Sequence, residues 1–169
     1  MGRQTIPLSH RWRFALDREN IGIRDGWHKQ GIPVYREVSL PHTYNIEGGT
    51  ETYRGAAWYE YHLDYDESLA DKRLCLQCNG IYRDADFWFN GENAGMHYGS
   101  GFTTFFIELP NNIRAGKTNV LTVRVQNPFT FDALPQGRHF DWADDGGIFR
   151  GITLIVTDTD AVDYVQIFA

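Results

Sequence analysis

The sequence predicts an all-β protein, an antiparallel β-sandwich of the jelly-roll type. Apolar and polar residues alternate with a period of two along eight or nine short segments, as expected for strands with one buried face. Aromatic residues make up 15% of the 169 residues, and 17 glycines accompany them. Aromatic side chains suit pleated sheets and glycine supplies the positive φ of tight turns, which favours short strands joined by turns. A chain of this length is expected to form a single domain over residues 1–169.

The first third of the chain contains two predicted strands and two predicted loops. Large apolar residues fall on alternate positions of 11–16, which predicts a first strand. The segment 17–33 is rich in glycine and charge and is predicted to be loop. A short strand over 38–40 ends at Pro41, because proline has no N–H to donate to a strand ladder. Three glycines mark 46–55 as an exposed loop.

The remaining strands follow from the same alternation and are predicted over 58–64, 73–78, 85–89, 102–109, 119–126, 151–157 and 162–168. Asn90-Gly91 indicates a type I′ hairpin turn, since both central positions of that turn need positive φ. Residues 114–117 are expected to close a helical turn before the next strand. The sequence contains no heptads, internal repeat or helix of ordinary length. A polar break at 157–160 precedes the last strand, and another domain is expected to begin beyond it.

Charge and hydropathy exclude several partners. The net charge of −6 argues against a nucleic-acid surface or binding to an anionic membrane. No apolar run approaches the roughly 20 residues of a membrane span, and no secretory signal opens the chain. The compartment stays open, because periplasmic, secreted and cytoplasmic settings all fit these residues.

The two cysteines, Cys75 and Cys78, form a C-x-x-C pattern within an alternating strand. Residues three apart on a strand lie about 10 Å apart and face opposite sides of the sheet, whereas a disulfide needs Cα atoms within about 7 Å. A second C-x-x-C that would complete a zinc site is missing from the sequence. The pair is therefore predicted to be packed or partly exposed free thiols.

Common catalytic motifs are also missing. The sequence contains no Gly-x-Ser-x-Gly, and the six histidines are scattered without an H-x-H or H-E-x-x-H pattern. The glycine-rich segment 95–101 lacks the ending and context of a phosphate loop, so it is predicted to be a long turn between strands. These observations predict no metal site and no serine nucleophile.

The segment 139–150 is the strongest candidate for function. It places three carboxylates, an indole and an imidazole before a Gly-Gly turn. Asp144 and Asp145 are expected to be solvated or to cap a turn. Asp141 lies between Phe140 and Trp142, and a carboxylate between aromatic rings suits a sugar, whose ring face stacks while its hydroxyls donate to the carboxylate.

Several motifs together resemble the N-terminal domain of family 2 glycoside hydrolases, the family of β-galactosidases, β-glucuronidases and β-mannosidases. The residues that carry the resemblance are VSLPHTYN at 38–45, the run 58–80, ADFWFNG at 85–91, GMHYG at 95–99, the run 102–106, GKTNVLTVRVQN at 116–127 and GGIFR at 146–150. The resemblance covers nearly the whole chain in the order that the family shows. It implies a galactose-binding-like jelly roll, followed in the family by an immunoglobulin-like domain and a catalytic barrel.

The resemblance also implies how the domain works. The catalytic glutamates of the family belong to the barrel, and the Asn-Glu dipeptide that marks the acid/base is missing here, so no catalytic residue is predicted in this chain. The family's sugar-contacting Asp lies six residues before the Gly of the Gly-Ile-Tyr/Phe-Arg motif, which corresponds to Asp141. Trp142 and Asn45 are further predicted substrate-binding residues, and Arg150 is predicted to be a structural ion-pair partner. In some β-galactosidases the matching Asp also binds sodium, so a sodium ion near Asp141 is possible in the full enzyme; no other cofactor is expected.

The prediction is therefore the N-terminal domain of a retaining β-glycosidase, first of all a β-galactosidase, whose partners are a carbohydrate substrate and the C-terminal domains of the same chain. Alone, the domain is expected to hydrolyse nothing. Two alternatives remain open: a stand-alone carbohydrate-binding module, and a purely structural domain that packs against the barrel.

Overall fold

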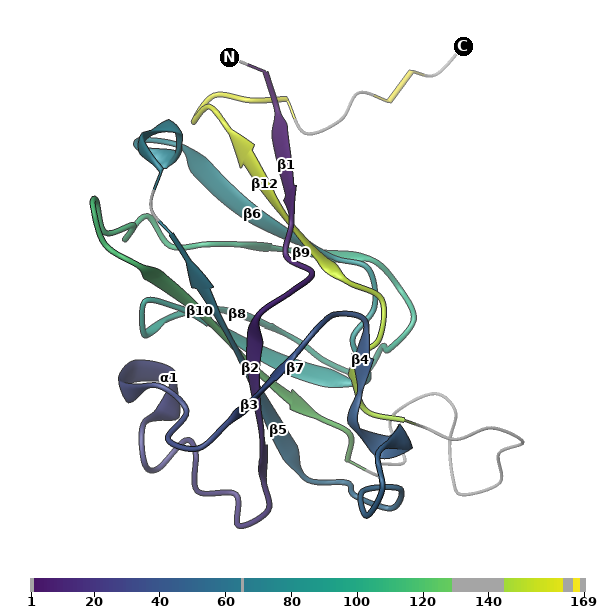
Figure 1. Cartoon of the computed structure of the whole chain (residues 1–169). Coiled ribbons are helices and arrows are strands. Elements are labelled where there is room, and N and C mark those ends of the chain that lie inside the picture. Colours follow the sequence, from purple (N-terminus) through teal and green to yellow (C-terminus); the bar gives the residue numbers. More distant parts are fainter. Residues whose placement is uncertain (1, 65, 129–144, 163–165, 168–169) are drawn as a thin grey trace.

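The computed structural model describes residues 2–64, 66–128, 145–162 and 166–167. Two antiparallel sheets form the body of the molecule (Figure 1). The four-stranded sheet has the order β1 (Gln4–Pro7), β12 (Ile152–Thr157), β6 (Arg73–Cys78) and β9 (Phe105–Glu108). The six-stranded sheet has the order β3 (Arg36–Val38), β2 (Trp12–Asp17), β5 (Ala56–Leu63), β10 (Asn119–Gln126), β7 (Asp84–Phe89) and β8 (Glu92–His97).

Shorter elements complete the fold. A two-stranded ladder joins β4 (His42–Thr43) to β11 (Gly147–Ile148). In the part of the chain that the structure describes, the helical elements are α1 (Trp27–Gln30) and the two 3₁₀ turns η1 (Tyr44–Ile46) and η2 (Glu67–Leu69). None of the helices in the described residues is long and apolar enough to cross a membrane.

The hydrophobic core lies between the two large sheets. In β6 the even-numbered residues are buried and the odd-numbered ones are partly exposed, which is the period-two pattern of a sheet with one face inward. The largest fully buried side chains of this core include Trp12, Tyr44, Tyr59, Phe87, Phe89, Leu76 and Leu154. Burying each large apolar side chain stabilises the fold by roughly 1.5–3 kcal/mol, so the core holds the two sheets face to face.

The outer face of the six-stranded sheet carries a second, smaller core. Trp58 and Trp88 stack with ring centroids 5.5 Å apart, and Trp27 of α1 packs on Trp58 at 5.7 Å. Ile32 completes this cluster. The segment 17–33, predicted to be loop, therefore contains a short helix that covers tryptophans which would otherwise be exposed.

The fold class and most strands are confirmed. The Asn90-Gly91 hairpin is also confirmed, with φ of 51° and 83° at the two central positions. Both cysteines are free, with Cys78 buried and Cys75 partly exposed, as predicted.

Other local predictions were wrong, among them the strand over 38–40, which the structure places at Arg36–Val38. The first half of the glycine-rich segment belongs to strand β8, where Gly95 adopts a φ of 133° that few other residues tolerate. The strand predicted over 102–109 is confined to β9. Residues 114–117 form a tight turn with Gly116 at φ 65°, not a helical turn. Val162, Gln166 and Ile167 show no strand pairing, and the rest of the predicted last strand lies outside the described residues.

Candidate functional site

The candidate site lies where the segment 145–150 enters the sandwich. Asp141 and Trp142, together with 139, 140, 143 and 144, lie outside the described residues. From Gly147 onward the chain forms β11, whose Gly147 pairs with Thr43 and whose Ile148 pairs with His42 of β4. Gly147 also bridges to Tyr82. The C-terminal end of the candidate loop is thus fixed to residues about one hundred positions earlier in the sequence.

Asn45 joins both ends of this loop to one point. Its side-chain oxygen accepts a hydrogen bond from the Gly146 backbone N–H at 2.7 Å and a longer one from the Asn127 side chain at 3.4 Å. Asn127 lies two residues before segment 129–144, which is outside the described residues, and Gly146 lies two residues after that segment. The described residues on either side of segment 129–144 therefore meet at a single amide, that of Asn45.

The amide nitrogen of Asn45 is equally occupied. It donates to the carbonyl oxygens of Thr50 at 2.7 Å and of Tyr53 at 2.9 Å. The residue as a whole is only 3% exposed. Direct sugar contact by Asn45 stays a prediction; within the described residues its donors and acceptor are used to fix the loop 46–53 and Gly146.

The Gly-Gly pair is required by close packing. A Cβ at Gly146 would overlap the Tyr44 hydroxyl, and a Cβ at Gly147 would overlap the His42 carbonyl oxygen. Gly147 also has a φ of 142°, which side chains rarely adopt. The Tyr44 N–H donates to the Gly146 carbonyl at 3.1 Å, so the peptide groups on both sides of Gly146 are bonded to η1 residues.

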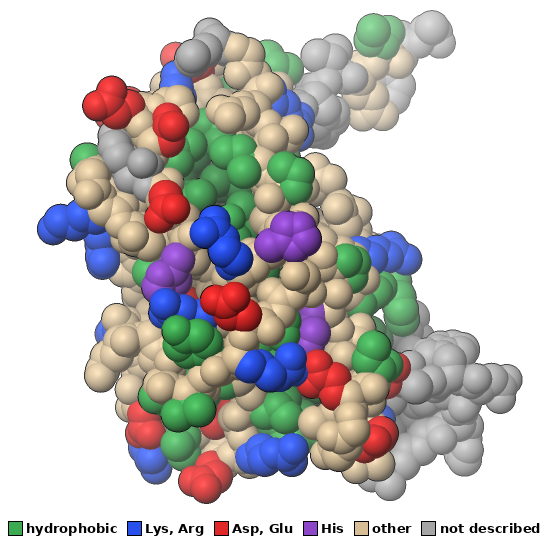
Figure 2. Space-filling view, viewed as in Figure 1, with side chains coloured by type: hydrophobic (Ala, Val, Ile, Leu, Met, Phe, Trp, Pro, Cys, Tyr) green, Lys and Arg blue, Asp and Glu red, His purple; other side chains and the backbone are tan. Residues whose placement is uncertain are grey.

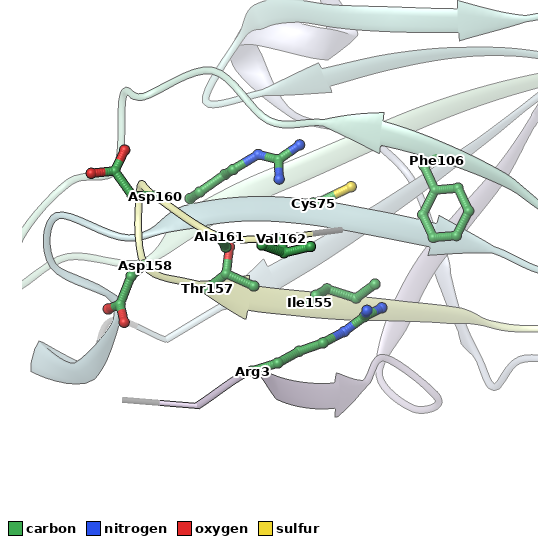
Figure 3. Close-up of a pocket in the computed structure, with 10 residues that line it drawn as sticks. Arg3, Cys75, Phe106, Ile155, Thr157, Asp158, Asp160, Ala161 and Val162 are labelled. Atoms are coloured by element: carbon green, nitrogen blue, oxygen red, sulfur yellow. The ribbon is translucent and has the colours of Figure 1, made fainter. Parts of the chain in front are cut away.

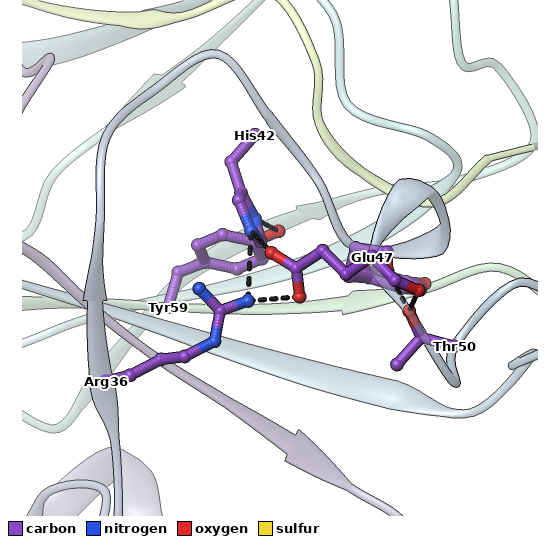
Figure 4. Close-up of polar contacts among 6 residues, drawn as sticks. Arg36, His42, Glu47, Thr50 and Tyr59 are labelled. Carbon is purple, nitrogen blue, oxygen red and sulfur yellow. Dashed lines mark hydrogen bonds and ion pairs between the residues drawn. The ribbon is translucent and has the colours of Figure 1, made fainter.

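A polar cluster around His42 supports the same corner (Figure 4). Nδ1 of His42 lies 2.8 Å from the Tyr59 hydroxyl and Nε2 lies 3.0 Å from the Glu47 carboxylate, which Arg36 also contacts. Burial lowers the pKa of His42 below its ordinary 6.5, although the bond to Glu47 opposes that shift. Burial also disfavours the charged form of Tyr59 and so raises the pKa of its hydroxyl. The imidazole and the phenol are therefore both neutral near pH 7.

The end of the motif is more exposed. Arg150 forms no ion pair with any described residue, so the predicted structural ion pair is not found there. Its guanidinium instead donates to the Phe102 carbonyl at 3.1 Å and lies 5.3 Å from the Phe149 ring centroid. Arg150 therefore holds the chain after β11 against the loop before β9.

Two of the surface grooves lined by described residues bear on function. The larger, about 660 Å³, is on the outer face of the four-stranded sheet, between Arg3, Phe106 and Val162, and is separate from the candidate site (Figure 3). A shallower groove of about 610 Å³ passes Trp27 and Tyr35 and reaches Glu47 and Thr50, next to the base of the loop. Figure 2 shows acidic and basic side chains interspersed on this face, without a patch of one sign.

The described residues contain no cluster of His, Cys, Asp or Glu side chains that would hold a metal ion. Sequence reasoning missed the roles of His42, Glu47 and Tyr59. His42 fell inside the VSLPHTYN resemblance, but its partners are 5 and 17 residues away in the sequence, and no spacing pattern links them.

Comparison with known proteins gives the family. The chain is 30% identical over 164 residues to a β-glucuronidase of Bacteroides fragilis, covering 95% of this chain and 22% of that protein. It is 30% identical over 172 residues to a β-galactosidase of Thermoanaerobacterium thermosulfurigenes, covering 98% of this chain and 23% of that protein. Among solved structures, a β-glucuronidase from an uncultured Clostridium superposes with a TM-score of 0.83 at 27% identity, covering 93% of this chain and 29% of that chain.

The chain thus spans less than a quarter of the length of these two curated relatives. The family model described as the sugar binding domain of glycosyl hydrolases family 2 matches residues 7–158. That match covers most of the chain, and the protein therefore belongs to glycosyl hydrolase family 2 through its sugar binding domain.

Proposed function

We propose that this chain is the N-terminal domain of a retaining β-glycosidase and that it lends a sugar-contacting loop to an active site on a following catalytic domain. The proposed contacts are Asp141, which accepts hydrogen bonds from sugar hydroxyls, and Trp142, which stacks on the sugar ring. The two carboxylates that break the glycosidic bond belong to the catalytic domain.

The observation that supports this proposal best is the closure of the loop base. Asn127 and Gly146 converge on the same Asn45 oxygen, at 3.4 and 2.7 Å. A loop whose two ends are bonded to one rigid point can present a side chain to a neighbouring domain with little conformational freedom at its base. Such support is what a binding group needs to hold substrate in a productive position.

The proposed substrates are terminal β-galactosides first and β-glucuronides second. Relatives at about 30% identity are named β-glucuronidase and β-galactosidase. The comparisons therefore support a β-glycoside as the substrate class, and both sugars are included in the test. The sodium ion that the resemblance associates with Asp141 stays a prediction, since Asp141 lies outside the described residues.

The test uses the full-length protein and the isolated 169-residue chain side by side. Release of p-nitrophenol is measured from β-galactoside, β-glucuronide and β-mannoside substrates. We expect hydrolysis by the full-length protein with retention of configuration, and none by the isolated chain. Hydrolysis by the isolated chain, or a full-length protein inactive on all three, would contradict the proposal.

Calorimetric titration of the isolated chain with galactose, glucuronate and mannose separates the alternatives. We expect no measurable binding, because half of the sugar site is missing. Millimolar or tighter binding would instead identify a self-sufficient carbohydrate-binding module.

A further inference from the structure

The outer face of the four-stranded sheet carries a strip of apolar side chains that crosses three strands. In β12, Leu154 and Val156 point into the core, so by alternation Ile155 between them points outward. The register places Ile155 directly opposite Cys75 of β6, and Phe106 of β9 lies on the same face, two residues further along the ladder. A sheet face left in water is normally polar, so this apolar strip (Ile155, Cys75 and Phe106) is unusual for a solvated face.

The apolar strip lies in the groove of about 660 Å³ (Figure 3). Ile155 is only 5% exposed, whereas Phe106, at the other end of the strip, is 57% exposed. After β12 the chain turns back over the sheet, and Ala161 and Val162 line the groove there. One wall of the groove is therefore the segment by which the chain leaves the sandwich.

The charges around the apolar strip balance one another. Among the described lining residues, the charged ones are two arginines, Arg3 and Arg73, and two aspartates, Asp158 and Asp160. Arg73 also forms an ion pair with Glu108 at 3.0 Å. A site for an anionic ligand would keep an excess of basic groups, whereas an apolar centre within a charge-balanced polar rim is the composition of a protein interface.

The size of the groove favours a partner within the same polypeptide. Ten described residues line it, whereas a standard interface between separate proteins takes about 20–30 residues a side. A smaller interface holds when a linker joins the two parts, because linkage gives them a high effective concentration. The segment 158–162 forms part of the groove, so a domain joined through it lies beside the apolar strip. The curated relatives are more than four times as long as the part that this chain matches.

We propose that this groove is the docking face for the domain that follows in the full-length enzyme, which covers Ile155, Cys75 and Phe106 with apolar side chains of its own. The inference rests on the proposed function, which supplies the following domain, and it names the face by which the two domains meet. It needs no contact with the sugar.

The two cysteines of β6 provide a probe and its internal control. Cys75 is partly exposed in the groove, and Cys78 is buried on the opposite face of the strand. N-ethylmaleimide labelling of the isolated chain and of the full-length enzyme is followed by trypsin and mass spectrometry, since cleavage after Arg73 and Arg83 releases both cysteines in one peptide. We expect Cys75 to be labelled about 10-fold more slowly in the full-length enzyme, and Cys78 to stay unlabelled in both.

A substitution at the exposed end of the strip tests the contact itself. In the full-length enzyme, Phe106→Lys is expected to return labelling of Cys75 to within about 2-fold of the isolated chain, because an ammonium group disfavours a covered apolar face. Met96→Lys, on β8 of the other sheet, is the matched control and is expected to leave Cys75 protected. In the isolated chain neither variant should shift the urea midpoint, since Phe106 and Met96 are 57% and 64% exposed there.

The outcomes separate this proposal from its neighbours. Equal labelling of Cys75 in the isolated chain and the full-length enzyme would overturn it, as would protection that persists in Phe106→Lys. Protection that is lost on dilution would mean that a second copy covers the face, which also contradicts docking within one chain. Labelling does not depend on activity: an active enzyme with a reactive Cys75 defeats the docking face alone, and an inactive one with a protected Cys75 defeats the proposed function alone.

Discussion

Replacing Asn45 with alanine is expected to destabilise the isolated domain more than any exposed asparagine would. The substitution removes three short hydrogen bonds, to Gly146 N at 2.7 Å and to the carbonyls of Thr50 at 2.7 Å and Tyr53 at 2.9 Å, plus the longer one at 3.4 Å. At about 0.5–1.5 kcal/mol each, with partners left buried, the loss sums to about 3 kcal/mol. Alanine also leaves a small cavity, because the site is 3% exposed.

Urea denaturation followed by tryptophan fluorescence measures this effect. With an m-value of about 2 kcal/mol/M, the midpoint is expected to fall by about 1.5 M at unchanged slope. Asn93→Ala, at an exposed position of β8, is the matched control and is expected to stay within about 0.5 kcal/mol of the parent. If Asn45→Ala costs less than about 1 kcal/mol, or no more than the control, Asn45 does not hold the base of the loop as argued.

Three further predictions concern other parts of the structure. Cys75 is expected to react with Ellman's reagent in the folded protein, whereas Cys78, buried and with its thiol pKa raised by burial, reacts only on unfolding; rapid labelling of both would contradict this packing. Burial lowers the pKa of His42 below the 6.5 of the unfolded chain, so the unfolded state binds a proton first as the pH falls. The contribution of His42 to stability is therefore full above pH 6.5 and is lost as the pH drops toward the folded pKa. His42→Gln should flatten the slope of the unfolding free energy between about pH 7.5 and 5.5, and an unchanged slope would refute His42 as the source of this pH dependence. Gly147→Ala is expected to cost more than about 3 kcal/mol in urea, because its Cβ would overlap the His42 carbonyl, whereas Gly151→Ala, also at positive φ but in open space, should lose only about 1–2 kcal/mol; equal losses would mean that strain alone matters.

Much of the sandwich was predictable from its sequence, because strands with one buried face repeat every two residues. That signal identified β2, β5, β6, β7, β10 and β12. It failed for β1, which is almost entirely exposed and so shows no alternation. It also failed for β4 and β11, since two-residue strands are too short to show a period.

The candidate site was only half predictable. The Gly146-Gly147 pair is a local signal for a close backbone approach, and the structure shows such an approach to Tyr44 and His42. The partners of that approach, Asn45 and His42, lie about one hundred residues earlier and are brought there by sheet pairing. Long-range pairing leaves no spacing pattern in a single sequence, so these contacts became visible only in three dimensions.

The central claim is that this domain supplies a sugar contact to an active site whose chemistry lies elsewhere in the chain. The most direct measurement compares kcat/KM of full-length Asp141→Ala and Asp145→Ala enzymes, a pair of matched carboxylate deletions on the same segment. We expect Asp141→Ala to lose about 10- to 100-fold, the worth of a hydrogen bond to a charged group, and Asp145→Ala to lose less than about 2-fold. Equal kcat/KM values for the two variants and the parent would contradict the claim and leave this domain a structural support.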